Sequence, residues 1–280
     1  MSNQKVIPTA WLIAYCRIFS DIPFSKEIFN EFEKVCAEKG QTIPDSLKNT
    51  RLTPQFEARY KLVGRLLKEN NVKQILEIAS GLSPRGLETT NQDLSLVYVE
   101  TDFSDLIGEK QQIIINCKKN YSSNLHFEPA NAFNLRELQE ASKYFDAKKP
   151  LAIVNEGLMR YLSFEERTIV AKNVLSLLTK FGGVWITPDV SNRASDSNEI
   201  LGRKLRDDII KMTGVNTNNN LFDDILHARK FFEDLCFEVE SHNFMEEIDN
   251  LTSPKALNLS RQEVEKLLNT RVAFVMRVKK

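Results

Sequence analysis

The sequence predicts an α/β protein built on one doubly wound, mostly parallel sheet of seven strands. Short apolar segments alternate with helices of about ten to twenty residues from residue 71 to residue 187, the pattern of parallel βαβ units. A late pair of strand-like segments, at 236–241 and 271–278, then breaks the alternation and encloses a predicted helix near 261–268.

We divide the chain into a helical amino-terminal extension, residues 1–70, packed on the core, and a main domain that follows it, residues 71–280. Pro8–Phe19 is expected to be the first helix, with proline in its first turn. Ser25–Glu38 is expected to be the second, capped by its serine and ended by the glycine at position 40. Residues 53–70 carry apolar side chains at helical spacing and predict a third.

The parallel strands are predicted where short apolar runs end in turns. They cover residues 72–78, 94–99, 125–127, 151–155 and 184–187, and residues 100–102 are expected to close the second strand. Helices are expected over 105–119, from the end of the loop 129–134 to residue 145, and over 163–179. Ser163 and Glu166 form a capping box at the start of the last of these helices. A polar insert, 189–230, follows the fifth strand and is interpreted either as a surface helix with a loop or as a lid over the substrate.

Composition excludes several classes of function. The 38 basic residues equal the 38 acidic ones, so the zero net charge argues against a broad nucleic-acid footprint. The four cysteines and three histidines are scattered, which disfavours both a metal site and a disulfide scaffold. Neither a signal peptide nor an apolar run of about 20 residues is recognisable, so we expect a cytoplasmic protein without a membrane span.

The turn after the first strand is the first candidate for ligand binding. In doubly wound sheets, ligands bind at the carboxyl ends of the strands. Ala79, Ser80 and Gly81 are small and would let a ligand approach the backbone there. The turn departs from the dinucleotide fingerprint, because Ala79 and Ser83 replace two of its three glycines. Taken alone, the motif is equally consistent with a purely structural turn.

A carboxylate follows the second strand. Asp102 lies about 20 residues beyond the turn, where an acid can accept hydrogen bonds from both ribose hydroxyls of an adenosine. The alternative is that Asp102, with Ser104, only caps the next helix. Glu100 is the neighbouring candidate, and we expect the alternation of side chains along the strand to let only one of the two acids face the ligand comfortably.

Two further loops carry candidates. After the third strand, Asn131 is placed to read an adenine edge and Phe133 to pack on its face, with Ala132 between them; a plain loop with a core phenylalanine is the alternative. After the fourth strand, Glu156 closes a buried segment and Gly157 permits close approach of a ligand. The alternative for Glu156 is an ordinary solvated acid.

Three of these segments resemble the leucine carboxyl methyltransferase family. Ala79–Arg85 resembles the family's glycine-containing turn, whose pattern is roughly G-A-G-L-D-T-R. Tyr98–Ser104 resembles its Y-x-E-V-D-x-P, and Glu156–Leu162 resembles its E-G-L-x-x-Y-L. The three occur in the family's order and spacing.

The resemblance implies a Rossmann-like class I methyltransferase that uses S-adenosyl-L-methionine to methylate oxygen, often that of a carboxylate. The family's cofactor residues then fall on Ala79, Gly81, Asp102 and Glu156, and the arginine that holds the cofactor carboxylate falls on Arg59. With their neighbours, the predicted cofactor-binding set is Arg59, Ala79, Ser80, Gly81, Arg85, Glu100, Asp102, Phe103, Asn131, Ala132, Phe133, Glu156 and Gly157.

The sequence departs from the family pattern at Ala79, Ser83, Ser104 and Arg160, which leaves the cofactor prediction in place and the acceptor, a small molecule or a protein terminus, undefined. Methyl transfer from a sulfonium depends on holding the reacting groups close and excluding water. A carboxylate acceptor is already ionised, so no side chain is assigned as a catalytic acid or base. Arg160 and Tyr161 are the predicted substrate contacts, unless Arg160 forms only a surface salt bridge.

Two other classes of function compete with this prediction. A nicotinamide-dependent oxidoreductase uses a similar sheet, but the missing third glycine disfavours it. A non-catalytic Rossmann-like binding module would keep the fold without the reaction. The sequence does not indicate an oligomeric state.

Overall fold

The structure, a computed structural model, describes residues 7–41, 45–117, 121–193, 210–211, 214 and 220–280. Its centre is one seven-stranded sheet with the order β3-β2-β1-β4-β5-β7-β6. The strands are β1 (Gln74–Ile78), β2 (Val97–Asp102), β3 (Leu125–Pro129), β4 (Leu151–Asn155), β5 (Gly183–Thr187), β6 (Phe237–Asn243) and β7 (Val272–Val278). The first five strands are parallel, whereas β7 runs antiparallel to both β5 and β6. The predicted doubly wound, mostly parallel sheet is confirmed.

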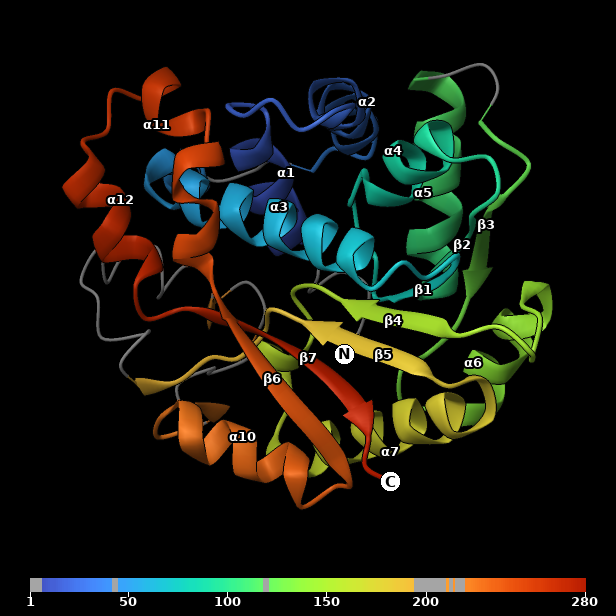
Figure 1. The fold of residues 1–280 in the computed structure, drawn as a ribbon. Helices are drawn as coiled ribbons and strands as arrows, with labels where there is room; N and C mark the ends of the chain where they lie inside the picture. The colour runs from blue at the N-terminus through green and yellow to red at the C-terminus, as the bar shows by residue number, and fades with distance from the viewer. Residues whose placement is uncertain (1–6, 42–44, 118–120, 194–209, 212–213, 215–219) are drawn as a thin grey trace.

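Helices cover both faces of the sheet (Figure 1). One face carries α1 (Ile7–Arg17), α2 (Ser25–Glu38), α3 (Thr53–Glu69), α4 (Arg85–Gln92), α5 (Ser104–Cys117), α11 (Ser253–Ala256) and α12 (Arg261–Leu268). The other carries α6 (Leu135–Ala141), α7 (Phe164–Phe181) and α10 (Ile225–Glu233). Short 3₁₀ turns are η2 (Asp45–Leu47), η3 (Thr50–Leu52), η4 (Ser142–Tyr144), η5 (Met159–Tyr161) and η8 (Phe244–Asn250).

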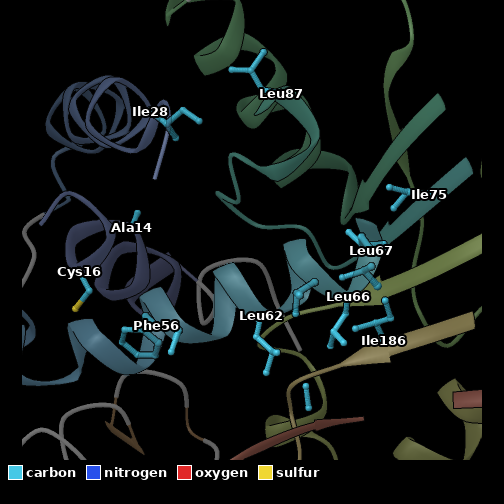
Figure 2. Packing of buried hydrophobic residues seen from close by; sticks show 14 of the residues in the cluster. Ala14, Cys16, Ile28, Phe56, Leu62, Leu66, Leu67, Ile75, Leu87 and Ile186 are labelled. Carbon is cyan, nitrogen blue, oxygen red and sulfur yellow. The ribbon is translucent and has the colours of Figure 1, made fainter. Parts of the chain in front are cut away.

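Alternation along the strands divides the core into two layers. On β4, Ala152 and Val154 join the cluster formed with α3, while Ile153 faces the cluster formed with α7. Figure 2 shows the first layer, in which Leu66 of α3 lies close to Ile186 of β5. Because both faces of the sheet are covered, the central strands β4 and β5 carry apolar side chains on both faces.

The amino-terminal helices follow the prediction closely, with α1 ending two residues before the expected Phe19. The cap of α2 differs. Ser25 is the first helical residue and makes no capping bond, while Phe24 takes the cap position in a left-handed conformation with φ of 64°. Gly40 follows α2 with φ of 65°, as expected for a residue that ends a helix.

The second strand begins and ends three residues later than predicted, at Val97–Asp102 instead of 94–99. β2 continues through the segment 100–102, which was expected to be a closing turn, because Thr101 pairs with Ile78 and Asp102 pairs with Pro129. Most of the predicted insert, 189–230, lies outside the described residues, so the choice between surface helix and lid does too. Among the helices that the structure describes, none is long and apolar enough to cross a membrane.

Gly86 of α4 gives a test of the packing on β2. A Cβ at this position would lie 2.2 Å from Oε1 of Glu100, whose carboxylate is held in the core by an ion pair with Lys110. We expect Gly86→Ala to lower the free energy of unfolding by about 1–3 kcal/mol, because overpacking exceeds the gain in helix propensity.

The matched control is Gly108→Ala in α5, where a Cβ would meet nothing within 4 Å. This variant is expected to be more stable than the wild type by about 0.5–1 kcal/mol. Urea denaturation measures both changes, and equal effects of the two substitutions would contradict the packing described here.

Candidate active site

A cavity opens where the order of the strands reverses between β1 and β4, at their carboxyl ends. Its wall combines α1, α3, the loops after β1, β2, β3 and β4, and the start of α7. The lining residues are Thr9, Ala10, Ile13, Arg17, Arg59, Ala79, Ser80, Gly81, Leu82, Ser83, Asp102, Phe103, Phe133, Glu156, Gly157, Leu158, Tyr161, Leu162 and Glu166. Residues as far apart in the sequence as Thr9 and Glu166 therefore meet at one cavity.

The turn after β1 is fixed by the end of β2. The N–H of Ser80 donates to the carbonyl of Thr101 at 2.9 Å, and the N–H of Gly81 donates to Oδ2 of Asp102 at 2.9 Å. Oδ1 of Asp102 accepts the N–H of Phe103 at 2.8 Å. Burial raises the pKa of Asp102, and these backbone donors oppose that rise by stabilising its carboxylate. The acid predicted to read a ribose thus also shapes the glycine turn.

Glu156 is the centre of a buried ion cluster. Its Oε1 lies 2.6 Å from Nη2 of Arg17 and 2.9 Å from Nη2 of Arg59, and its Oε2 lies 2.6 Å from Nη2 of Arg85. Burial alone would raise the pKa of Glu156, but Arg59, Arg17 and Arg85 lower it well below its usual value. Glu156 is therefore a carboxylate at neutral pH.

A second acid completes the cluster. Arg85 also donates to Oε1 of Glu77 at 2.9 Å, and the hydroxyl of Tyr98 donates to the other oxygen of Glu77 at 2.7 Å. The cluster thus contains three guanidinium groups and two carboxylates, which leaves one excess positive charge beside the cavity. Such an excess favours an anionic ligand group there.

The expectation that alternation along the strand would let only one of Glu100 and Asp102 face the ligand is wrong. Two residues that are two positions apart point to the same face of a strand, so alternation does not separate them. What separates them is their place along β2. Asp102 lines the cavity at the strand's end, whereas Glu100 is fully buried against Lys110, and burial raises its pKa to about 7.

Five residues of the predicted sites are absent from the cavity wall: Arg85, Glu100, Asn131, Ala132 and Arg160. Arg85 is buried and does not line the cavity, but its guanidinium group forms an ion pair with Glu156, which does. The side-chain oxygen of Asn131 accepts the N–H of Phe133 at 3.0 Å, so it shapes the loop that carries that ring. The carbonyl of Ala132 accepts a hydrogen bond from Asn173 of α7 at 2.9 Å.

The sequence analysis missed the contribution of the first helix. Thr9, Ala10, Ile13 and Arg17 all line the cavity, at positions that fall on one face of α1. The only sequence signal for Arg17 is a charged residue that directly follows an apolar run, and this signal does not name a partner. No cluster of histidine, cysteine and acidic residues able to hold a metal occurs among the residues that the structure describes.

The family profile of leucine carboxyl methyltransferases matches residues 26–175, more than half of the chain. The chain belongs to this family. A search of curated proteins finds no match. The family membership confirms the resemblance drawn from the three motifs.

Solved structures support the fold of this leucine carboxyl methyltransferase family member. A DUF574 family protein from Streptomyces avermitilis aligns with a TM-score of 0.60 at 14% identity, covering 97% of each chain. A putative methyltransferase from Thermobifida fusca gives 0.53 at 14%, covering 96% of this chain and 94% of the other. Magnesium protoporphyrin IX methyltransferase from Synechocystis, with bound S-adenosylhomocysteine (SAH), gives 0.52 at 10%, covering 90% and 94%. The protein is a methyltransferase, and S-adenosylmethionine is its cosubstrate.

The ion cluster predicts a pH-dependent loss of stability in Glu156→Gln. The substitution leaves three buried guanidinium groups with too little compensating charge, so we expect the free energy of unfolding at pH 7 to fall by about 3–5 kcal/mol. The folded-state pKa of Glu156 is depressed, so the wild-type advantage is complete above about pH 4.5 and shrinks as the pH falls further.

Urea denaturation of both proteins from pH 7 down to about pH 3.5 measures this difference. Glu238→Gln, on the exposed side of β6, is the control and should behave like the wild type throughout. A wild-type advantage that is constant over the whole pH range would contradict the role given to the carboxylate.

Proposed function

We propose that the protein methylates an oxygen atom and that its acceptor is a carboxylate. The observation that carries this proposal is that each carboxylate in the cavity wall already has partners. Asp102 accepts two backbone N–H groups, Glu156 is bound by three arginines, and Glu166 closes the capping box of α7. Within the described wall, these acids are engaged and poorly placed to remove a proton, so an acceptor that arrives ionised fits best.

We assign the binding of the cosubstrate to residues of the same wall. Asp102 would hold the ribose hydroxyls, Phe133 would pack on the adenine, and the arginine pair Arg17 and Arg59 would hold the methionine carboxylate. The excess positive charge of the ion cluster supports the last assignment. So do two buried atoms of the wall that lack a hydrogen-bond partner, Oγ of Ser80 and Nε of Arg17, which a polar ligand would satisfy.

S-adenosylmethionine, when bound, supplies an electrophilic methyl group on its sulfonium. The chain's own contribution is placement and the exclusion of water. Ile13, Leu158 and Leu162 make part of the wall apolar. Tyr161 also lines the cavity and Arg160 does not, which makes Tyr161 the better of the two predicted acceptor contacts. We also propose that residues 1–70 complete this active site, since Arg17 and Arg59 both belong to them. A small molecule or a protein terminus suits the neutral charge of the chain better than nucleic acid does.

Calorimetric titration with S-adenosylmethionine tests the assignment of the ribose. Asp102→Ala is expected to weaken binding at least tenfold, or ~1.4 kcal/mol, because it removes the acceptor for the hydroxyls and loosens the turn at Gly81. Asp105→Ala, three residues on and outside the cavity wall, should bind like the wild type. Equal affinities of all three proteins would refute the assignment.

The chemistry of the product tests the proposal of a carboxylate acceptor. A panel of carboxylic acids, alcohols and amines is incubated with the enzyme and S-adenosylmethionine labelled on its methyl group. A methyl ester releases labelled methanol in mild alkali, whereas methyl ethers and methylamines do not. We expect the label to be released from the product. A product stable to alkali would move the acceptor to a hydroxyl or an amine.

A further inference from the structure

The turn that follows β4 is held by a buried carboxylate, that of Asp189, two residues after the end of β5. Oδ1 of Asp189 accepts the N–H of Gly157 at 2.8 Å. Its Oδ2 accepts the N–H of Leu158 at 2.8 Å and that of Met159 at 3.1 Å. One side chain therefore satisfies three consecutive backbone donors in the segment that connects Glu156 to the apolar part of the cavity wall.

Consecutive N–H groups that converge on one point form a nest, which in proteins generally binds an anion. Gly157 makes this geometry accessible, since its φ of 88° lies in the region that side chains disfavour. In this protein the anion in the nest is the protein's own carboxylate. Asp189 is 32 positions from Gly157 in the sequence, so this carboxylate reaches the nest only through the tertiary fold.

The carboxylate of Asp189 is itself fixed by the ends of β4 and β5. Nδ2 of Asn155 donates to its Oδ2 at 2.9 Å and to Oγ1 of Thr187 at 3.0 Å. The side-chain oxygen of Asn155 accepts the indole N–H of Trp185 at 2.7 Å. This buried network leaves Asp189 little freedom to turn away from the nest.

A guanidinium group holds the other side of the same turn. Nε of Arg167 donates to the carbonyl of Met159 at 2.9 Å, and its planar head lies 5.1 Å from the ring of Phe164 and 4.8 Å from that of Phe222. Burial lowers the pKa of Arg167 to about 10, partly offset by the attraction of Asp189, so the group stays charged at neutral pH. The turn is thus clamped between an anion and a cation.

We infer that Asp189 is a positioning residue for methyl transfer: its carboxylate fills the nest at 157–159 and thereby keeps Glu156 in contact with the arginines of the ion cluster. The inference rests on the proposed function, because two of these arginines are the ones assigned to the carboxylate of the cosubstrate. Asp189 is not in the cavity wall, so it acts through the turn and not by contact with a ligand.

Chemical rescue of Asp189→Ala tests this role. The variant removes the anion and leaves room in the nest for a small carboxylate from solution. We expect calorimetric titration to show at least tenfold weaker SAH binding than in the wild type, with saturable recovery in sodium formate. Formamide, a neutral molecule of the same shape, and sodium chloride should give no recovery. Asp234→Ala, an exposed acid just after α10, is the control and should bind SAH like the wild type.

The thermal midpoint of Asp189→Ala provides a readout that needs no cosubstrate. It should fall relative to the wild type and rise again with formate but not with formamide. If the alanine variant does not fold, Asp189→Asn takes its place. Its SAH binding should be weakened likewise, because the neutral amide brings no negative charge into the nest and offers one acceptor oxygen instead of two.

Unchanged SAH affinity in a folded variant, or equal recovery with formamide, would overturn the inference. A wild-type protein that fails to bind SAH would instead overturn the cofactor assignment. The formate-dependent midpoint would then still show whether an anion in the nest holds the turn.

Discussion

A buried carboxylate needs compensating positive charge, and Glu156 obtains it from three different helices. Arg17 ends α1, Arg59 lies in the middle of α3 and Arg85 begins α4, so the three helices must converge at the carboxyl end of β4. Removing one partner of such a cluster leaves a buried charge without compensation, which costs several kcal/mol. The position of the amino-terminal helices on the sheet, and with it the shape of the cavity, depends on this one set of ion pairs.

The strands and the order of the motifs could be predicted because each depends on residues that are close together in the sequence. Apolar runs flanked by turns identify β1 and β4, and the acids that close two strands identify Asp102 and Glu156. The remaining features depend on long-range contacts. Arg17 meets its partner 139 positions away, and Asp189 meets its turn 32 positions away. Neither of these long-range contacts can be identified from the local sequence. The comparison of Glu100 with Asp102 shows further that two acids on the same face of β2 differ by their place along the strand, because only the one at the strand's end lines the cavity.

Two of the departures from the family pattern, Ala79 and Ser104, lie at the turn after β1 and at the start of α5. Ala79 replaces a family glycine and adopts φ of 54°, a conformation that costs a residue with a side chain about 1–2 kcal/mol. The hydrogen bonds of the next two residues to the end of β2 hold the turn in place despite this strain. Ser104 replaces the family proline as the first residue of α5, so the helix begins without the fixed φ that proline would supply there.

The order of the sheet has a consequence for synthesis. β6 is made before β7 but pairs only with it, and β7 lies between β5 and β6. Until residues 272–278 have left the ribosome, the edge of β5 and both edges of β6 therefore remain open. Unpaired edges of this kind recruit strands from other chains. Between the synthesis of β6 and that of β7, the nascent protein accordingly presents open strand edges that favour aggregation and the binding of chaperones.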